Sequence, residues 1–153
     1  MMPMADVFSA AVLLLLVIDP FGNVPLVVSA LANVAPARRT RVILRECIAA
    51  YVILLAFMFG GQTFLRWLQL SEVSLAIAGG IILFLIALRM VFRHPEGLFG
   101  DPPGAEPFLV PLAIPSIAGP SALATVMLMV SRNPSQQVAW IVALTVAMAV
   151  ATI

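Results

Sequence analysis

IDPFGNVP, residues 18–25, interrupts one long apolar run of this chain, and IPSIAGPS, residues 114–121, interrupts another in the same way. Each segment has two prolines five residues apart with a glycine between them. Proline lacks an N–H and clashes with the preceding helical turn, so such a segment leaves backbone amides and carbonyls without helical partners. In hydrocarbon, such breaks are tolerated only where they are buried in protein or line a wet cavity. Paired breaks in corresponding halves of a chain point to the binding site of a transporter.

The composition indicates an integral membrane protein. Hydrophobic residues make up 63% of the chain and charged residues only 10%, with a mean hydropathy of +1.13, whereas soluble domains carry about 25% charged residues. At about 20 residues per span, a chain of this length accommodates five short-looped spans. We therefore expect an all-α membrane protein with five transmembrane helices. The net charge of +1 and the absence of a basic stripe argue against a nucleic-acid partner.

Five apolar runs are the expected spans, at about 7–34, 42–65, 73–92, 108–130 and 138–153. The first is long enough to cross a bilayer with an unwound middle; a cleaved signal peptide is the weaker alternative, because no basic residue precedes the run. In the third run, Ala76–Gly80 forms a small-residue surface that allows close helix approach. The last run is about 24 Å of helix. It therefore indicates either a terminus in the far interface or, by preference, a C-terminally truncated chain.

The arginines predict the orientation, because short cytoplasmic loops carry an excess of Lys and Arg. Six of them share one side of the expected topology: Arg38, Arg39, Arg41, Arg45, Arg89 and Arg93. Arg66 and Arg132 lie on the other side. The N-terminus is therefore expected to be extracytoplasmic, and the two broken spans are expected to run in opposite directions.

Opposed broken helices suggest an inverted repeat of three spans each. In this interpretation, residues 1–153 form a single polytopic membrane domain, with repeat one at about 1–93, a linking loop at about 94–107 and an incomplete repeat two at about 108–153. Superposing the two breaks places Pro20 on Pro115 and Pro25 on Pro120. The sixth span of such a repeat is missing from the second half.

A resemblance to a known family is carried by four segments: IDPFGNVP (18–25), IAGG (77–80), RMVF (89–92) and VPLAIPSIAGP (110–120). The first and last resemble the two signature segments of the MarC family, and the two between them are similar to its third helix. The resemblance implies a multi-pass protein of the bacterial inner membrane, usually with about six spans in two repeats and grouped with transporters of the LysE type. Some relatives are transporters of small neutral amino acids.

Asp19 is the acidic residue that lies deepest within an apolar run, and an intramembrane carboxylate is costly unless it faces a cavity or a partner. One interpretation is that Asp19 coordinates Na⁺ together with freed carbonyls and Asn23. A second is that it carries a proton, because low dielectric raises a carboxyl pKa. A structural alternative, compatible with both, is that Asp19 caps the half-helix that begins at Pro20.

The remaining candidates lie in the same two breaks. Asn23 offers a donor and an acceptor, which could hold a solute or satisfy unwound backbone. Gly119 and Ser121 flank exposed helix amides that suit a carboxylate, although a packed proline kink explains them as well. The complete set of expected substrate- or ion-binding residues is Asp19, Pro20, Gly22, Asn23, Pro25, Pro115, Ser116, Gly119, Pro120 and Ser121.

Other polar residues carry less weight. Arg45 and Glu46 are adjacent and are expected not to share a helix face, so Glu46 is expected to be solvated or paired with a loop arginine. Cys47 is expected to be a buried, inert thiol. Thr125 is expected to bond its own backbone rather than a ligand.

The sequence and this resemblance therefore predict a secondary transporter of a small polar solute, such as a neutral amino acid, coupled to H⁺ or Na⁺. A passive channel and a non-transporting membrane scaffold or regulator are the alternatives. No nucleophile–base pair, phosphate loop or zinc motif occurs, so an enzyme, a cofactor and a metal site are not expected. The expected partners are membrane lipid, a small solute and H⁺ or Na⁺, and a homo-oligomer is left open.

Overall fold

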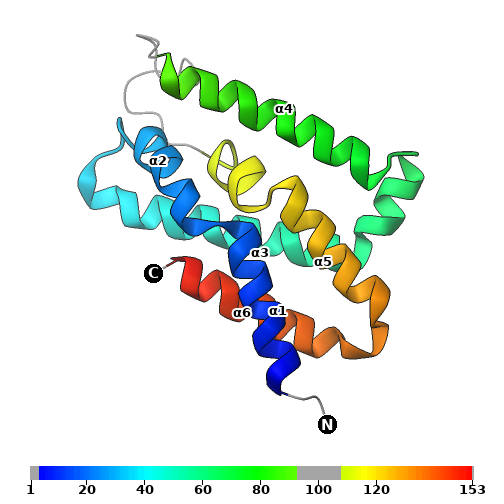
Figure 1. The fold of residues 1–153 in the computed structure, drawn as a ribbon. Helices are drawn as coiled ribbons and strands as arrows, with labels where there is room; N and C mark the ends of the chain where they lie inside the picture. Colours follow the sequence, from blue (N-terminus) through cyan, green and yellow to red (C-terminus); the bar gives the residue numbers. More distant parts are fainter. Residues whose placement is uncertain (1–3, 93–107, 153) are drawn as a thin grey trace.

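The computed structural model describes residues 4–92 and 108–152, and this part of the chain is helical (Figure 1). The proposed linking loop at 94–107 lies outside the described residues, as does Arg93. The elements in chain order are α1 (Met4–Ile18), α2 (Pro20–Ala30), α3 (Pro36–Trp67), α4 (Glu72–Val91), η1 (Leu112–Ile117), α5 (Pro120–Arg132), η2 (Pro134–Gln136) and α6 (Gln137–Thr152).

The first predicted break is confirmed between α1 and α2. Asp19 adopts a left-handed backbone conformation with φ 47°, which a short polar side chain tolerates better than most. Pro20 occupies the first helical position of α2, where its missing N–H costs nothing. The chain therefore leaves one helix and begins another within a single residue.

The second predicted break is also confirmed. Leu112–Ile117 forms one wide turn, within which Ile114 has an extended backbone with φ −129° and ψ 133°. Pro120 then begins α5. Gly119 is required between the two, because a Cβ at that position would lie 2.6 Å from the backbone oxygen of Pro115.

The helix starts pair the prolines of the two breaks differently from the predicted superposition. Pro20 begins α2 and Pro120 begins α5, so these two prolines hold equivalent helical positions. The sequence pattern had placed Pro20 opposite Pro115, which instead lies inside η1. Proline spacing is a poor guide to register because each proline either begins a helix or interrupts one, and both occur here.

Within residues 4–92 and 108–152, four segments are long and apolar enough to cross a membrane: Asp6–Ala30, Pro36–Trp67, Val73–Val91 and Pro134–Thr152. The remaining expected span, 108–130, is divided between η1 and α5. At 13 residues, α5 extends for about 20 Å, less than the hydrocarbon thickness of about 30 Å. A fifth span is thus complete only if the broken segment crosses together with α5, and the count of five stays a prediction.

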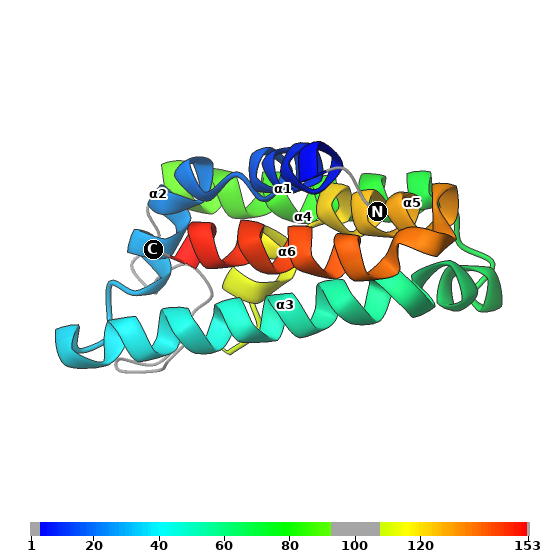
Figure 2. The same cartoon turned by 90° about the horizontal axis from the view of Figure 1, so that it is seen from below.

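The helices lie alongside one another as a bundle with two distinct ends (Figure 2). One end holds the start of α3, the end of α4 and α2; we call it the arginine-rich end, because Arg38, Arg39, Arg41 and Arg89 lie in these helix termini. The other, the N-terminal end, holds the start of α1 and the ends of α3 and α5, with Arg66 and Arg132. Both views show α1–α2 and α5 running in opposite directions.

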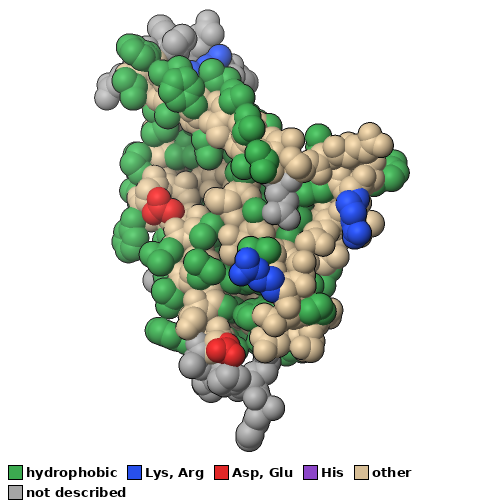
Figure 3. Space-filling model, turned by 45° about the vertical axis from the view of Figure 1, so that its right-hand side comes forward, with side chains coloured by type: hydrophobic (Ala, Val, Ile, Leu, Met, Phe, Trp, Pro, Cys, Tyr) green, Lys and Arg blue, Asp and Glu red, His purple; other side chains and the backbone are tan. Residues whose placement is uncertain are grey.

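The bundle is packed inside and apolar outside. Leu14, Leu54, Val126 and Leu144 are fully buried in one core that joins α1, α3, α5 and α6. Large hydrophobic side chains also cover much of the outer surface, and Figure 3 shows few charged groups on one face. An apolar exterior around a packed core is the arrangement expected of a protein whose surrounding solvent is lipid.

The small-residue surface predicted on the third span is used at one position. Gly79 on α4 lies against the ring of Pro120, whose Cγ would be 1.9 Å from a Cβ added to the glycine. A Cβ on the neighbouring Gly80 would meet no atom within 4 Å. Gly79 therefore allows α4 to pack directly against the start of α5.

The two adjacent glycines Gly79 and Gly80 should respond differently to an added methyl group. Gly79→Ala forces the proline ring and α4 apart, and overpacking of this kind costs about 1–3 kcal/mol. Gly80→Ala adds a methyl group in open space and gains helix propensity of up to about 1 kcal/mol. Thermal unfolding in detergent should therefore rank Gly80→Ala at or above the parent protein and Gly79→Ala below it. Equal stability of the two variants would contradict the packing of Gly79 on Pro120.

Candidate functional site

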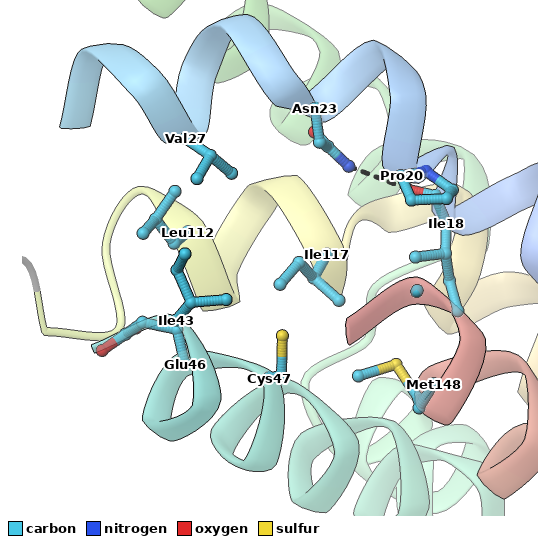
Figure 4. Close-up of a pocket in the computed structure, with 11 residues that line it drawn as sticks. Ile18, Pro20, Asn23, Val27, Ile43, Glu46, Cys47, Leu112, Ile117 and Met148 are labelled. Atoms are coloured by element: carbon cyan, nitrogen blue, oxygen red, sulfur yellow. Dashed lines mark hydrogen bonds between the residues drawn. The ribbon is translucent and has the colours of Figure 1, made fainter. Parts of the chain in front are cut away.

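A partly enclosed cavity of about 70 Å³ lies where the two breaks meet, between α2, η1, α3 and α6. Figure 4 shows apolar side chains around most of it, with the Cys47 thiol on α3 directed toward Ile117 of η1. The polar residues of its lining are Asn23, Glu46 and Cys47. An apolar hollow with a few polar groups is the usual form of a small-molecule site.

Asn23 joins the two breaks. Its Nδ2 donates to the carbonyl of Ile18 at 2.8 Å, a group that the break after α1 leaves without its usual helical partner. Its Oδ1 accepts a hydrogen bond from the hydroxyl of Ser116, which comes from η1, 93 residues further along the chain. One end of the amide therefore satisfies unwound backbone, as one of the two interpretations predicts, and the other end reaches across to the second break. A contact between Asn23 and a solute stays a prediction.

Asp19 caps α2. Its Oδ1 accepts a hydrogen bond from the amide of Gly22 at 3.0 Å, which confirms the capping interpretation. The residue is exposed and is not part of the cavity lining. Capping does not exclude a further part in ion coupling, which stays a prediction.

The other expected site residues divide by burial. Pro20 lines the cavity, and Ser116 reaches Asn23. Pro115 and Gly119 are buried in the second break, while Pro120 is half-buried against Gly79. The three that are exposed and outside the cavity lining are Gly22, Pro25 and Ser121. Thr125 donates to the backbone oxygen of Ser121 at 2.7 Å, as predicted.

Glu46 is buried, contrary to the expectation from the sequence. Its exposed fraction is 1%, and its Oε1 accepts hydrogen bonds from Nε and Nη2 of Arg45 at 3.1 and 3.0 Å. The expectation that it is solvated or paired with a loop arginine was wrong: its partner is the adjacent residue, whose long side chain folds back to reach it. A signal was present, because Glu46 continues the four-residue spacing of buried positions on α3.

The second oxygen of Glu46 holds the chain that precedes the second break. Its Oε2 accepts a hydrogen bond from the amide of Leu109 at 2.8 Å. Leu109 has a φ of 62°, a left-handed conformation that costs a branched residue about 1–2 kcal/mol and needs support from its surroundings. The guanidinium of Arg45 also lies over the ring of Phe108, 5.1 Å from its centroid. Glu46 and Arg45 together therefore fix the segment that leads into η1.

An apolar layer closes the cavity on the side of the N-terminal end. Ile18 and Met148 line the cavity, and Leu14 and Leu144 lie one helical turn further along α1 and α6, both with an exposed fraction of 0%. These two leucines belong to the same packed core. Four residues of helix extend for about 6 Å, so Leu14 and Leu144 form an apolar layer of about this thickness between the cavity and the N-terminal end of the bundle.

Comparisons with known proteins agree on one family. A family model described as "MarC family integral membrane protein" matches residues 4–153. The "UPF0056 inner membrane protein YhgN" of Escherichia coli (strain K12) is 46% identical over 145 residues, which cover 94% of this chain and 74% of that protein.

Two further relatives are similar. A "UPF0056 membrane protein" of Buchnera aphidicola subsp. Schizaphis graminum is 47% identical over 126 residues, covering 82% of this chain and 64% of the relative. The "UPF0056 membrane protein PYRAB13050" of Pyrococcus abyssi is 34% identical over 130 residues, covering 82% and 65% respectively. No solved structure matches the chain. These names describe membrane proteins rather than enzymes.

The two carboxylates of this region should differ in their effect on stability. Glu46→Ala removes the acceptor for Leu109 and the partner of Arg45, so we expect a loss of about 1–3 kcal/mol in the free energy of unfolding. Asp19→Asn keeps an oxygen that accepts from Gly22 and a side chain that tolerates the left-handed conformation, so we expect a change below about 0.5 kcal/mol. Unfolding titrations in detergent measure both. A smaller loss for Glu46→Ala than for Asp19→Asn would contradict this account of the site.

Proposed function

This chain belongs to the MarC family of integral membrane proteins, and from that premise we propose that it is a secondary transporter of a small polar solute. The observation that carries the proposal is the cavity between the two broken helices, whose mostly apolar wall includes the polar side chains of Asn23, Glu46 and Cys47. Discontinuous helices that meet at a cavity are the recurring form of a transporter binding site. The opposed directions of α1–α2 and α5 support an inverted repeat.

The size of the cavity supports a small solute. One water molecule needs about 10–15 Å³ of such volume, so the cavity has room for about five water-sized groups. The side chains of Ile18, Val27 and Leu112 suit a short apolar portion, and Asn23 suits a polar end. A neutral amino acid of the size of glycine or alanine fits this description.

The distribution of arginines supports an orientation. We infer that the arginine-rich end faces the cytoplasm and that the N-terminus is extracytoplasmic. The cavity lies toward the arginine-rich end, because its α3 and α6 residues come from the start of α3 and the last turns of α6. The layer of Leu14 and Leu144 would then separate it from the extracytoplasmic side, as alternating access requires of a site open toward one side only.

Transport can be tested directly in liposomes that contain the purified full-length protein. Uptake of radiolabelled glycine or alanine should saturate and should exceed equilibrium under an H⁺ or Na⁺ gradient. Flux that is independent of the gradient and does not saturate would instead indicate a passive channel, and no flux would indicate a scaffold or regulator.

Asn23→Ala is expected to reduce uptake at low solute concentration by about 5- to 150-fold, because a polar group of the solute left without its hydrogen-bond partner costs about 1–3 kcal/mol. Ser29→Ala, on the same helix but outside the cavity lining, is the matched control and should transport normally. Normal uptake by Asn23→Ala would rule out the cavity as the binding site.

Coupling is assigned by two further variants. Asp19 is the coupling candidate derived from the sequence, and Glu46 is a buried carboxylate that lines the cavity. The variants Asp19→Asn and Glu46→Gln are compared for accumulation of solute against its gradient. If one variant still equilibrates solute but no longer accumulates it, the residue changed in that variant is the coupling carboxylate. Full accumulation by both variants would contradict carboxylate coupling.

A further inference from the structure

A second hollow, open to the surface and about 520 Å³ in volume, lies at the N-terminal end of the bundle. Its walls come from the start of α1, the end of α5, η2 and the first turns of α6. Unlike the cavity at the breaks, it brings side chains of opposite charge to one place: Asp6 on α1 and Arg132, the last residue of α5.

These charges are not paired with each other. Within residues 4–92 and 108–152, neither Asp6 nor Arg132 takes part in an ion pair, although both line the same hollow. Side chains of opposite charge that face a shared space without meeting leave room for a ligand that carries both charges. An Arg guanidinium suits a carboxylate, to which it can donate two parallel hydrogen bonds.

A third group in this hollow lacks a partner. The Oε1 atom of Gln136 is buried and accepts no hydrogen bond within the described part of the chain. A buried acceptor without a donor costs about 1–3 kcal/mol, so such atoms in native structures call for an explanation. An ammonium group has three N–H donors, which is enough for the carboxylate of Asp6 and, once the amide of Gln136 turns into the hollow that this residue lines, for its Oε1 as well.

We propose that this hollow is a binding site for a small zwitterion, with the anionic end of the ligand at Arg132 and its ammonium at Asp6 and Gln136. The apolar part of the wall, which includes Leu13 and Leu128, accommodates a short aliphatic portion. The proposal of a binding site depends only on these residues and not on transport. Its part in transport, as the site of first contact from the N-terminal end, rests on the proposed function.

The position of the hollow links it to the central cavity. Ala10 and Trp140 line the hollow, Leu14 and Leu144 follow one turn later, and the next turn brings Ile18 and Met148 into the cavity. The two sites therefore lie along the same faces of α1 and α6, with one apolar layer between them. Along α1, Ala10 of the hollow and Ile18 of the cavity are eight residues apart, which is about 12 Å of helix.

Binding is tested by calorimetric titration of glycine, acetate and methylamine into the full chain in phosphatidylcholine nanodiscs. Glycine should bind at least tenfold more tightly than either single-charge probe. Asp6→Asn and Arg132→Gln should each weaken glycine binding at least tenfold. Arg66→Gln is the matched control, since Arg66 lies at the same end and donates to its own helix at Gln62.

The double variant Asp6→Arg with Arg132→Asp is the control for misfolding. It restores both charges in exchanged positions, so it should recover part of the affinity for glycine that the single variants lose. Glycine binding that is unchanged in both single variants would overturn the proposal. So would loss of glycine binding when phosphatidylethanolamine is added to the nanodiscs, since the hollow would then hold a zwitterionic lipid headgroup.

Transport kinetics separate this inference from the proposed function. In liposomes, Asp6→Asn and Arg132→Gln should raise KM for glycine at least tenfold with little change in kcat, whereas an unchanged KM would overturn the part of this site in transport. Glycine binding without any flux would overturn the proposed transport and leave the zwitterion site standing.

Discussion

Every backbone group at membrane depth needs a hydrogen-bond partner, and the rest of this structure depends on how Asn23 meets that requirement. The break at Asp19 frees the carbonyl of Ile18, and the Asn23 amide both satisfies that carbonyl and accepts from Ser116. The side chain that satisfies the freed carbonyl in the first break therefore also binds the second broken segment. The cavity lies beside this contact because two interrupted helices cannot pack as closely there as two continuous ones.

The second break is held in place from two further directions. On one side, Glu46 binds the amide of Leu109 and so fixes the chain before η1. On the other, Gly79 allows α4 to lie directly against Pro120 at the start of α5. Each contact joins segments far apart in the sequence, so the geometry of the cavity is set by tertiary packing and not by either break alone.

The sequence predicted much of the fold but only part of the site. Both breaks, the helical class and the cap at Asp19 follow from local rules about proline, glycine and short acidic side chains, which is why they could be predicted. The burial of Glu46 was missed because the rule that adjacent residues face apart ignores the reach of an arginine side chain and a partner 63 residues away. The Asn23–Ser116 contact could not be predicted, because it depends on how two helices rotate against each other.

A double-mutant cycle between Asn23 and Ser116 tests most directly whether this bond joins the two breaks. The free energy of unfolding in detergent is measured for Asn23→Ala, Ser116→Ala, the double variant and the parent chain. The account predicts a coupling energy of about 1 kcal/mol, because residues in direct contact are not additive. If the loss of stability in the double variant equals the sum of the two single losses to within about 0.3 kcal/mol, as it does for independent sites, the account is contradicted.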